Sequence, residues 1–387
     1  MPYCEVRKEQ SGDSSDGASL NNGIKIFYRT YGSGPTKVLL IIGLAGTHDS
    51  WGPQIKSLTG TTKPNDEDGN FEEMVNGNSG GGIEVCAFDN RGMGRSSVPV
   101  KKSEYTTKTM AKDAIALLDH LDWKKVHVFG HSMGAMISCK LAAMVPDRIL
   151  SLALLNVTGG GFECFPKFDR RTLSVAIRFL RAKTPEERAA VDLDTHYTEE
   201  YLEELVGSST RRSILYQEYV EGISATGMQS NSGFDGQIHA CWTHKMKRAE
   251  IEAIRTAGFL VSVIHGRYDI IAQIYYARRL AQKLYPVARM IDLHGGHLVS
   301  HERPEEVNQA LIELINGSEK KINPHDWSNL PKKTSGFLGK DKSCMSSTME
   351  KLHLFLLYLF GLFALAYGYG RRSIQNLKPV KVGTSLK

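Results

Sequence analysis

Short apolar runs alternate along the chain with segments whose apolar residues recur at helical spacing. The run 38–42 (VLLII) is continuous, as a strand buried on both faces of a parallel sheet requires. Further strands are predicted at 23–31, 83–88, 126–129, 150–155, 259–264 and 288–293. Helices are predicted at 109–121, 133–144 and 304–315. This alternation predicts an α/β fold, with a mostly parallel sheet flanked by helices.

A helical block interrupts the alternation after the strand at 150–155. It has helical patterns, many charges and no strong strand, so we expect a helical lid inserted into the core. The chain then divides into a flexible N-terminus at 1–20, a core at 21–158 and 257–317, the lid at 159–256, a linker at 318–350, a transmembrane segment at 351–370 and a basic tail at 371–387.

The positive charge of the chain is concentrated near its C-terminus. The whole sequence carries a formal net charge of +6, but residues 331–387 hold ten Lys and Arg against two Asp and Glu. The preceding part is therefore close to neutral, which argues against a nucleic-acid binder. Apolar residues make up 41% of the chain, enough for a large buried core.

Residues 352–370 form an uncharged, apolar stretch of 19 residues. A helix of this length just crosses a hydrocarbon core of about 30 Å. Arg371 and Arg372 follow it directly, and tyrosines near its end are typical of a membrane interface. The stretch predicts a single membrane pass near the C-terminus, with a buried terminal helix as the alternative.

The N-terminal residues are polar and lack the apolar core of a signal peptide. We therefore expect insertion after synthesis, as a tail anchor that leaves the catalytic domain in the cytosol; the organelle stays open. The basic residues after the segment favour the opposite orientation. The tail anchor is preferred because a short basic tail crosses a membrane more easily than a whole domain.

Residues 130–134 (GHSMG) match the pattern G-x-S-x-G. Ser132 follows a predicted strand and opens a predicted helix, the context of a nucleophile elbow, in which a tight turn exposes the serine hydroxyl. A second match at 77–81 contains Ser79, but no strand precedes it, so we interpret that copy as structural. Ser132 is thus the candidate nucleophile.

A serine hydroxyl needs a base to take its proton, and the base needs an acid to orient it. Asp269 follows the strand 259–264, and His297 follows the strand 288–293, both at the edge where open α/β sheets place their sites. The chain order Ser, Asp, His is the order of such hydrolases. His294 and His301 remain alternatives for the base.

A developing oxyanion needs two hydrogen-bond donors. One candidate is the backbone N–H of Met133, the residue after the nucleophile. The other is expected in the turn 42–46 (IGLAG), with Leu44 as the first choice and Ala45 as the second.

These motifs together resemble the α/β-hydrolase superfamily, in its lidded, epoxide-hydrolase-like branch of serine hydrolases. The resemblance spans 22–316 and includes GHSMG, HGRYD at 265–269, GGH at 295–297, and a D-x-R-G-x-G-x-S turn at 89–96, which is structural in the family. Ile42 stands where the family usually has His. Ser132 replaces the nucleophilic Asp of epoxide hydrolases, which makes epoxide or haloalkane chemistry improbable.

The resemblance implies a serine hydrolase that cleaves a carboxylic ester or a related acyl compound through an acyl-enzyme. It implies no cofactor and no metal. The expected partners are a small-molecule ester or lipid-like substrate and a membrane, reached through the C-terminal helix. A hydrolase-like ligand receptor with slow or no turnover is the alternative function, because some plant hormone receptors resemble this fold and keep the triad.

Overall fold

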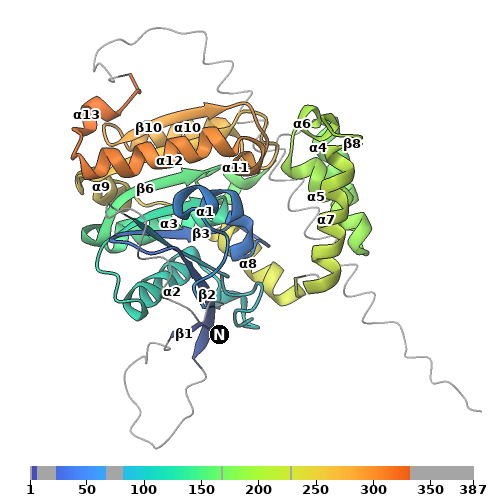
Figure 1. The fold of residues 1–387 in the computed structure, drawn as a ribbon, viewed down its shortest axis with the longest axis horizontal. Helices are drawn as coiled ribbons and strands as arrows, with labels where there is room; N and C mark the ends of the chain where they lie inside the picture. The colour runs from blue at the N-terminus through green and yellow to red at the C-terminus, as the bar shows by residue number, and fades with distance from the viewer. Residues whose placement is uncertain (1, 7–22, 67–81, 167–168, 227–228, 332–387) are drawn as a thin grey trace, which may run out of the picture. The chain divides into compact units, whose positions relative to one another are not determined.

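One eight-stranded sheet forms the centre of the described part of the chain (Figure 1). Its strands follow the order β1 (Tyr3–Val6), β2 (Ile24–Tyr31), β4 (Ile83–Phe88), β3 (Thr36–Ile41), β5 (Val126–His131), β6 (Ile149–Leu155), β9 (Leu260–Gly266) and β10 (Ala288–Leu293). The first two pairings are antiparallel, and the strands from β4 to β10 run parallel to one another. The predicted mostly parallel α/β architecture is therefore confirmed.

The computed structural model describes residues 2–6, 23–66, 82–166, 169–226 and 229–331. They belong to one compact unit that ends at Pro331. The second serine motif with Ser79, the transmembrane segment, the basic tail and most of the predicted linker lie outside the described residues.

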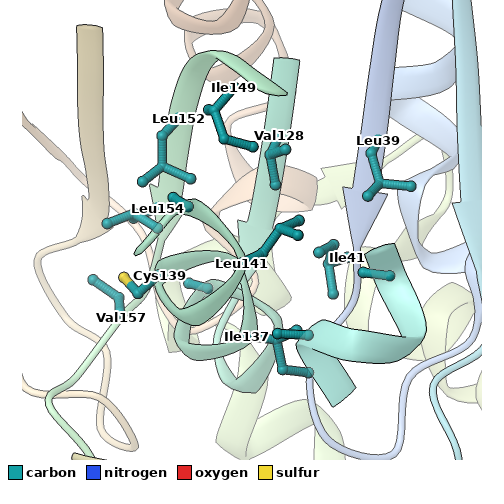
Figure 2. Packing of buried hydrophobic residues seen from close by; sticks show 14 of the residues in the cluster. Leu39, Ile41, Val128, Ile137, Cys139, Leu141, Ile149, Leu152, Leu154 and Val157 are labelled. Carbon is teal, nitrogen blue, oxygen red and sulfur yellow. The ribbon is translucent and has the colours of Figure 1, made fainter. Parts of the chain in front are cut away.

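Helices cover both faces of the sheet and bury a core on each. One face carries α2 (Thr107–His120), α3 (Met133–Met144), α9 (Arg248–Thr256) and α10 (Ile274–Lys283); the other carries α1 (Gly52–Thr59) and α12 (Pro304–Glu319). Strand β3 sends Leu39 and Ile41 to the first face, and Val38 and Leu40 to the second. Figure 2 shows the first core, where α3 lies against β3, β5 and β6. Burial on both faces explains the continuous apolar run.

The predicted lid lies between β6 and β9 and is largely helical. It contains α4 (Arg170–Arg181), α5 (Pro185–His196), α6 (Glu199–Glu203), α7 (Arg211–Thr226) and α8 (Asn231–Thr243), with a small hairpin of β7 (Leu205–Val206) and β8 (Ser209–Thr210). Figure 1 shows α4, α5 and α7 side by side. The described residues also form short helices: η1 (His48–Trp51), η2 (Lys102–Glu104), η3 (Pro146–Arg148), η4 (Gly161–Cys164), α11 (Val299–Glu302) and α13 (Pro324–Trp327).

Three segments differ from the sequence-based boundaries. Residues 3–6, expected to be flexible, form β1, because pairing with β2 buries Cys4 and brings the Tyr3 ring against Phe27. Helix α9, expected in the lid, packs on core helix α3, where Lys140 forms an ion pair with Glu250. The core also extends into the predicted linker, because Trp327 is buried and its indole N–H donates to the Val261 carbonyl.

A buried histidine in the sheet makes stability depend on pH. His127 of β5 lies 2.7 Å from the Ser151 hydroxyl, and burial lowers its pKa to about 4. In the unfolded chain the His127 imidazole has its usual pKa of about 6.5. Between pH 6.5 and pH 4 this imidazole is therefore protonated in the unfolded chain but neutral in the folded protein, so the free energy of unfolding falls as the pH drops through this range. Between pH 7 and pH 5, we expect the free energy of unfolding to fall by about 2 kcal/mol less in His127→Gln than in the wild-type protein. Urea unfolding at both pH values measures this, and an unchanged loss would contradict it.

Candidate active site

Ser132 stands at a sharp turn between β5 and α3. Its φ is 54° and its ψ is −119°, a conformation that L-residues rarely adopt. Its backbone N–H donates to the Leu155 carbonyl at 2.8 Å, which anchors the turn to β6. The strained backbone is thus held by the neighbouring strand, in the arrangement expected of a nucleophile elbow.

The glycines on either side of Ser132 are required by close packing. A Cβ atom at Gly130 would lie 2.3 Å from the Ser138 hydroxyl oxygen, and one at Gly134 would lie 2.0 Å from the Ile41 carbonyl oxygen. Real Cβ atoms do not approach so closely. The G-x-S-x-G spacing at this site therefore reflects the crossing of β3, β5 and α3.

Ser132, His297 and Asp269 meet at the C-terminal edge of the sheet. The Ser132 Oγ lies 3.1 Å from Nε2 of His297, and Nδ1 of the same ring lies 2.8 Å from Oδ2 of Asp269. The residues follow β5, β10 and β9, whose C-terminal ends lie on the same edge. The parallel sheet thus joins three segments that are far apart in sequence.

The Asp269 carboxylate is buried but well supplied with donors. Its Oδ1 accepts from the backbone N–H groups of Ile271 and Ala272, each at 2.8 Å. Its Oδ2 accepts from His297 and from Nδ2 of Asn156, at 2.7 Å. Burial would raise the pKa of Asp269, but His297, the nearby His265 and the hydrogen bond from Asn156 outweigh it and lower the pKa to about 2. The ionised carboxylate can only accept, so Nδ1 of His297 donates to it, and in the neutral ring Nε2 is the nitrogen left to accept a proton.

The two alternative histidines are engaged elsewhere. Nε2 of His301 donates to the Ser50 carbonyl at 2.7 Å. His294 lies 3.1 Å from Glu200 in an ion-pair geometry and packs its ring on Tyr268. Of the three candidates, His297 is the one whose ring lies within hydrogen-bond distance of the Ser132 hydroxyl. A fourth histidine, His131, donates from Nε2 to the His297 carbonyl and so supports the loop that carries the base.

The turn with the proposed oxyanion donors packs directly on the nucleophile. A Cβ atom at Gly43 would lie 3.0 Å from the Ser132 Cβ, so the turn touches the elbow. The Ala45 N–H donates to Oε1 of Gln237 at 3.0 Å. Because that N–H is already engaged, Leu44 is the better candidate of the two predicted for this turn. Met133 opens α3 beside it, where helix N-terminal N–H groups lack intrahelical partners.

The lid approaches the site through the end of α5. The His196 ring stacks on His297 with centroids 6.2 Å apart, and the His196 carbonyl accepts from the Leu298 N–H at 2.9 Å. A Cβ atom at Gly296 would lie 2.6 Å from that carbonyl oxygen, which explains the second glycine of the GGH motif. Burial and the nearby His297 hold the pKa of His196 well below its usual range, so the ring stays neutral.

Sequence reasoning missed three residues that contact this site. Asn156 could have been found, because it directly follows β6 at the same sheet edge as Ser132 and Asp269. His196 and Gln237 lie in lid helices without any motif, so no sequence signal distinguishes them.

Two further observations concern the described ranges alone. Among these residues, no group of three or more His, Cys, Asp or Glu side chains is arranged to hold a metal ion. Likewise, none of the helices formed by these residues is both long and apolar enough to cross a bilayer. The stretch 352–370 lies outside this part of the chain.

Comparison with known proteins agrees with this architecture. Residues 37–304 match the alpha/beta hydrolase fold family, so the chain belongs to that family. The putative carbamate hydrolase RutD of Caulobacter segnis is 31% identical over 296 residues, which cover 76% of this chain and 97% of the relative. The putative non-heme bromoperoxidase BpoC of Mycobacterium tuberculosis is 27% identical over 237 residues, which cover 60% and 83% of the two chains.

A solved structure shares the same fold. The enol-lactonase from Burkholderia xenovorans superposes with a TM-score of 0.58 at 22% identity, covering 76% of this chain and 98% of the lactonase. The chain is thus an enzyme of the hydrolase class with the α/β fold. The narrower epoxide-hydrolase-like branch stays a prediction.

Proposed function

We propose that the protein is a serine hydrolase that cleaves a carboxylic ester or a related acyl substrate. The observation that carries this proposal is the continuous hydrogen-bonded chain from the Ser132 hydroxyl through His297 to Asp269. In the proposed reaction, Nε2 of His297 takes the Ser132 proton while Oγ attacks the substrate carbonyl carbon. Asp269 keeps the imidazole in the required tautomer and stabilises its charged form.

The negative charge that develops on the carbonyl oxygen would be stabilised by the N–H groups of Leu44 and Met133. The protonated His297 then gives its proton to the leaving alcohol, which departs and leaves an acyl-enzyme on Ser132. Water, deprotonated by the same imidazole, then attacks the acyl carbon. The bond between this carbon and Oγ breaks, the imidazole returns the proton to Oγ, and the acid is released. These steps need only groups of this chain, the substrate and water.

Labelling with a fluorophosphonate probe tests the proposal, because the probe phosphonylates an activated serine. We expect one label, found on Ser132 by peptide mass spectrometry. A series of esters of increasing acyl length then tests the lipid-like substrate. Labelling without turnover of any ester would favour the receptor alternative, and an absence of labelling would contradict the proposed nucleophile.

Attachment to a membrane through 352–370 is part of the proposal and rests on the sequence of that stretch alone. We expect a protein truncated after Glu350 to be active and to stay in the supernatant, because it lacks the apolar stretch. The full-length protein should resist extraction from membranes with alkaline carbonate. Full-length protein found wholly in the supernatant without detergent would contradict the membrane segment.

A further inference from the structure

We infer that Gln237 of the lid is a positioning residue, which holds the oxyanion turn 42–46 in its working conformation. The inference rests on the proposed function, because it concerns the N–H of Leu44 in that turn. Gln237 does not contact the reacting atoms in this proposal. It acts through the backbone of Ala45, the residue after Leu44.

The Gln237 side chain is fully buried and joins three segments. Its Oε1 accepts from the Ala45 N–H at 3.0 Å and from Nε2 of Gln229 at 3.0 Å. Its Nε2 donates to the Arg91 carbonyl at 3.0 Å. One amide therefore ties lid helix α8 both to the oxyanion turn and to the turn 89–96. A buried amide with both ends engaged has little freedom to move.

Helix α8 is itself fixed against the core at this point. A Cβ atom at Gly233 would lie 2.1 Å from the Gly92 carbonyl oxygen, and one at Gly236 would lie 2.4 Å from the Tyr105 ring. Gln229 also donates to the Gly92 carbonyl at 2.8 Å. The close approach of the two glycines holds the backbone of α8 next to Gln237, so the amide of Gln237 is presented to Ala45 from a rigid position.

The turn needs such support because its backbone is strained. Ala45 has a φ of 60°, in the left-handed region that favours glycine. On the other side of the turn, Nδ2 of Asn90 donates to the Ile42 carbonyl at 2.8 Å. Leu44 thus lies between two anchored residues. Without Gln237, Ala45 can relax toward a common conformation, and Leu44, which shares a peptide bond with Ala45, is then no longer held from that side.

The contact between Gln237 of the lid and Ala45 of the oxyanion turn should therefore affect kcat. Loss of one oxyanion donor costs about 100- to 1000-fold in kcat in known hydrolases. Loss of its support should cost less, about 10- to 100-fold, because the donor is displaced rather than deleted. The effect should fall on kcat and leave KM nearly unchanged, because the oxyanion exists only after attack.

Three variants separate this role from general packing. Gln237→Ala removes the bond to Ala45. Gln229→Ala is the matched control, because it removes the bonds from Gln229 to Gly92 and to Oε1 of Gln237 but leaves the Gln237–Ala45 and Gln237–Arg91 bonds in place. Gln237→Glu is the conservative rescue, because a neutral buried carboxyl offers one acceptor to Ala45 and one donor to Arg91. Thermal unfolding shows whether each variant is folded.

We expect Gln237→Ala to lose about 10- to 100-fold in kcat and to bind a trifluoromethyl ketone, whose adduct carries an oxyanion, more weakly by the same factor. Gln237→Glu should recover most of the kcat and most of the affinity for the ketone, and Gln229→Ala should keep both at the wild-type level. Equal losses in Gln229→Ala and Gln237→Ala, or an unchanged kcat in a folded Gln237→Ala, would overturn the inference.

Amide hydrogen exchange at Ala45 tests the contact without any substrate. Exchange at this N–H should accelerate in Gln237→Ala and stay slow in Gln229→Ala and Gln237→Glu. Equal exchange in all three variants would overturn the inference even if the wild-type enzyme hydrolyses esters. A wild-type protein that no fluorophosphonate labels at Ser132 would instead contradict the proposed function, and the exchange at Ala45 would still decide whether Gln237 holds the turn.

Discussion

We expect Ser132→Ala to abolish both fluorophosphonate labelling and ester hydrolysis, with a loss of about 10⁶-fold in kcat. The reason is that the acyl-enzyme forms on Oγ, the atom that lies 3.1 Å from His297. The measurement is peptide mass spectrometry of the labelled protein together with steady-state turnover. The variant should keep the elbow conformation, because the backbone hydrogen bond from residue 132 to the Leu155 carbonyl does not depend on the side chain.

Ser79→Ala is the matched control, because Ser79 lies in the second G-x-S-x-G sequence of the same chain. It should leave labelling and turnover unchanged. Retained labelling in a folded Ser132→Ala protein would show that another residue is the nucleophile.

We expect His297→Ala to cost nearly as much as the loss of Ser132, because triad members act as a unit. Asp269→Asn should cost less, about 10⁴-fold in kcat, because the amide no longer selects the tautomer with a free Nε2. Nδ1 of the imidazole would then face the asparagine NH₂ group or an oxygen of lower charge. Turnover and labelling rates of both variants measure these losses.

The two rival histidines supply the controls for the base. His294→Ala should be close to wild type in kcat, since the His294 ring pairs with Glu200 rather than with Ser132. His301→Ala removes the bond to Ser50 and should lower stability more than kcat. An inactive but folded His301→Ala protein beside an active His297→Ala protein would show that the base has been misassigned.

The sequence by itself determined most strands of the central sheet and the position of the elbow. Strands buried on both faces must be apolar throughout, so β3 is visible as VLLII. A serine turn packed between a strand and a helix excludes side chains on both sides, so Gly130 and Gly134 are visible as a motif. Asp269 and His297 could be predicted because each follows a strand, and the C-terminal ends of parallel strands lie at one edge of the sheet.

The tertiary structure alone decided which residues support these groups. Residues 3–6 are too short a segment to predict a strand, and only the free edge of β2 makes them one. Nothing in the sequence distinguishes His297 from His301 except the glycines before it, whereas hydrogen-bond partners separate them. Gln237 reaches Ala45 from a position 192 residues away in the chain. Such contacts depend on how a lid helix packs on two core turns, and an amide side chain carries no local pattern that reports its distant partner.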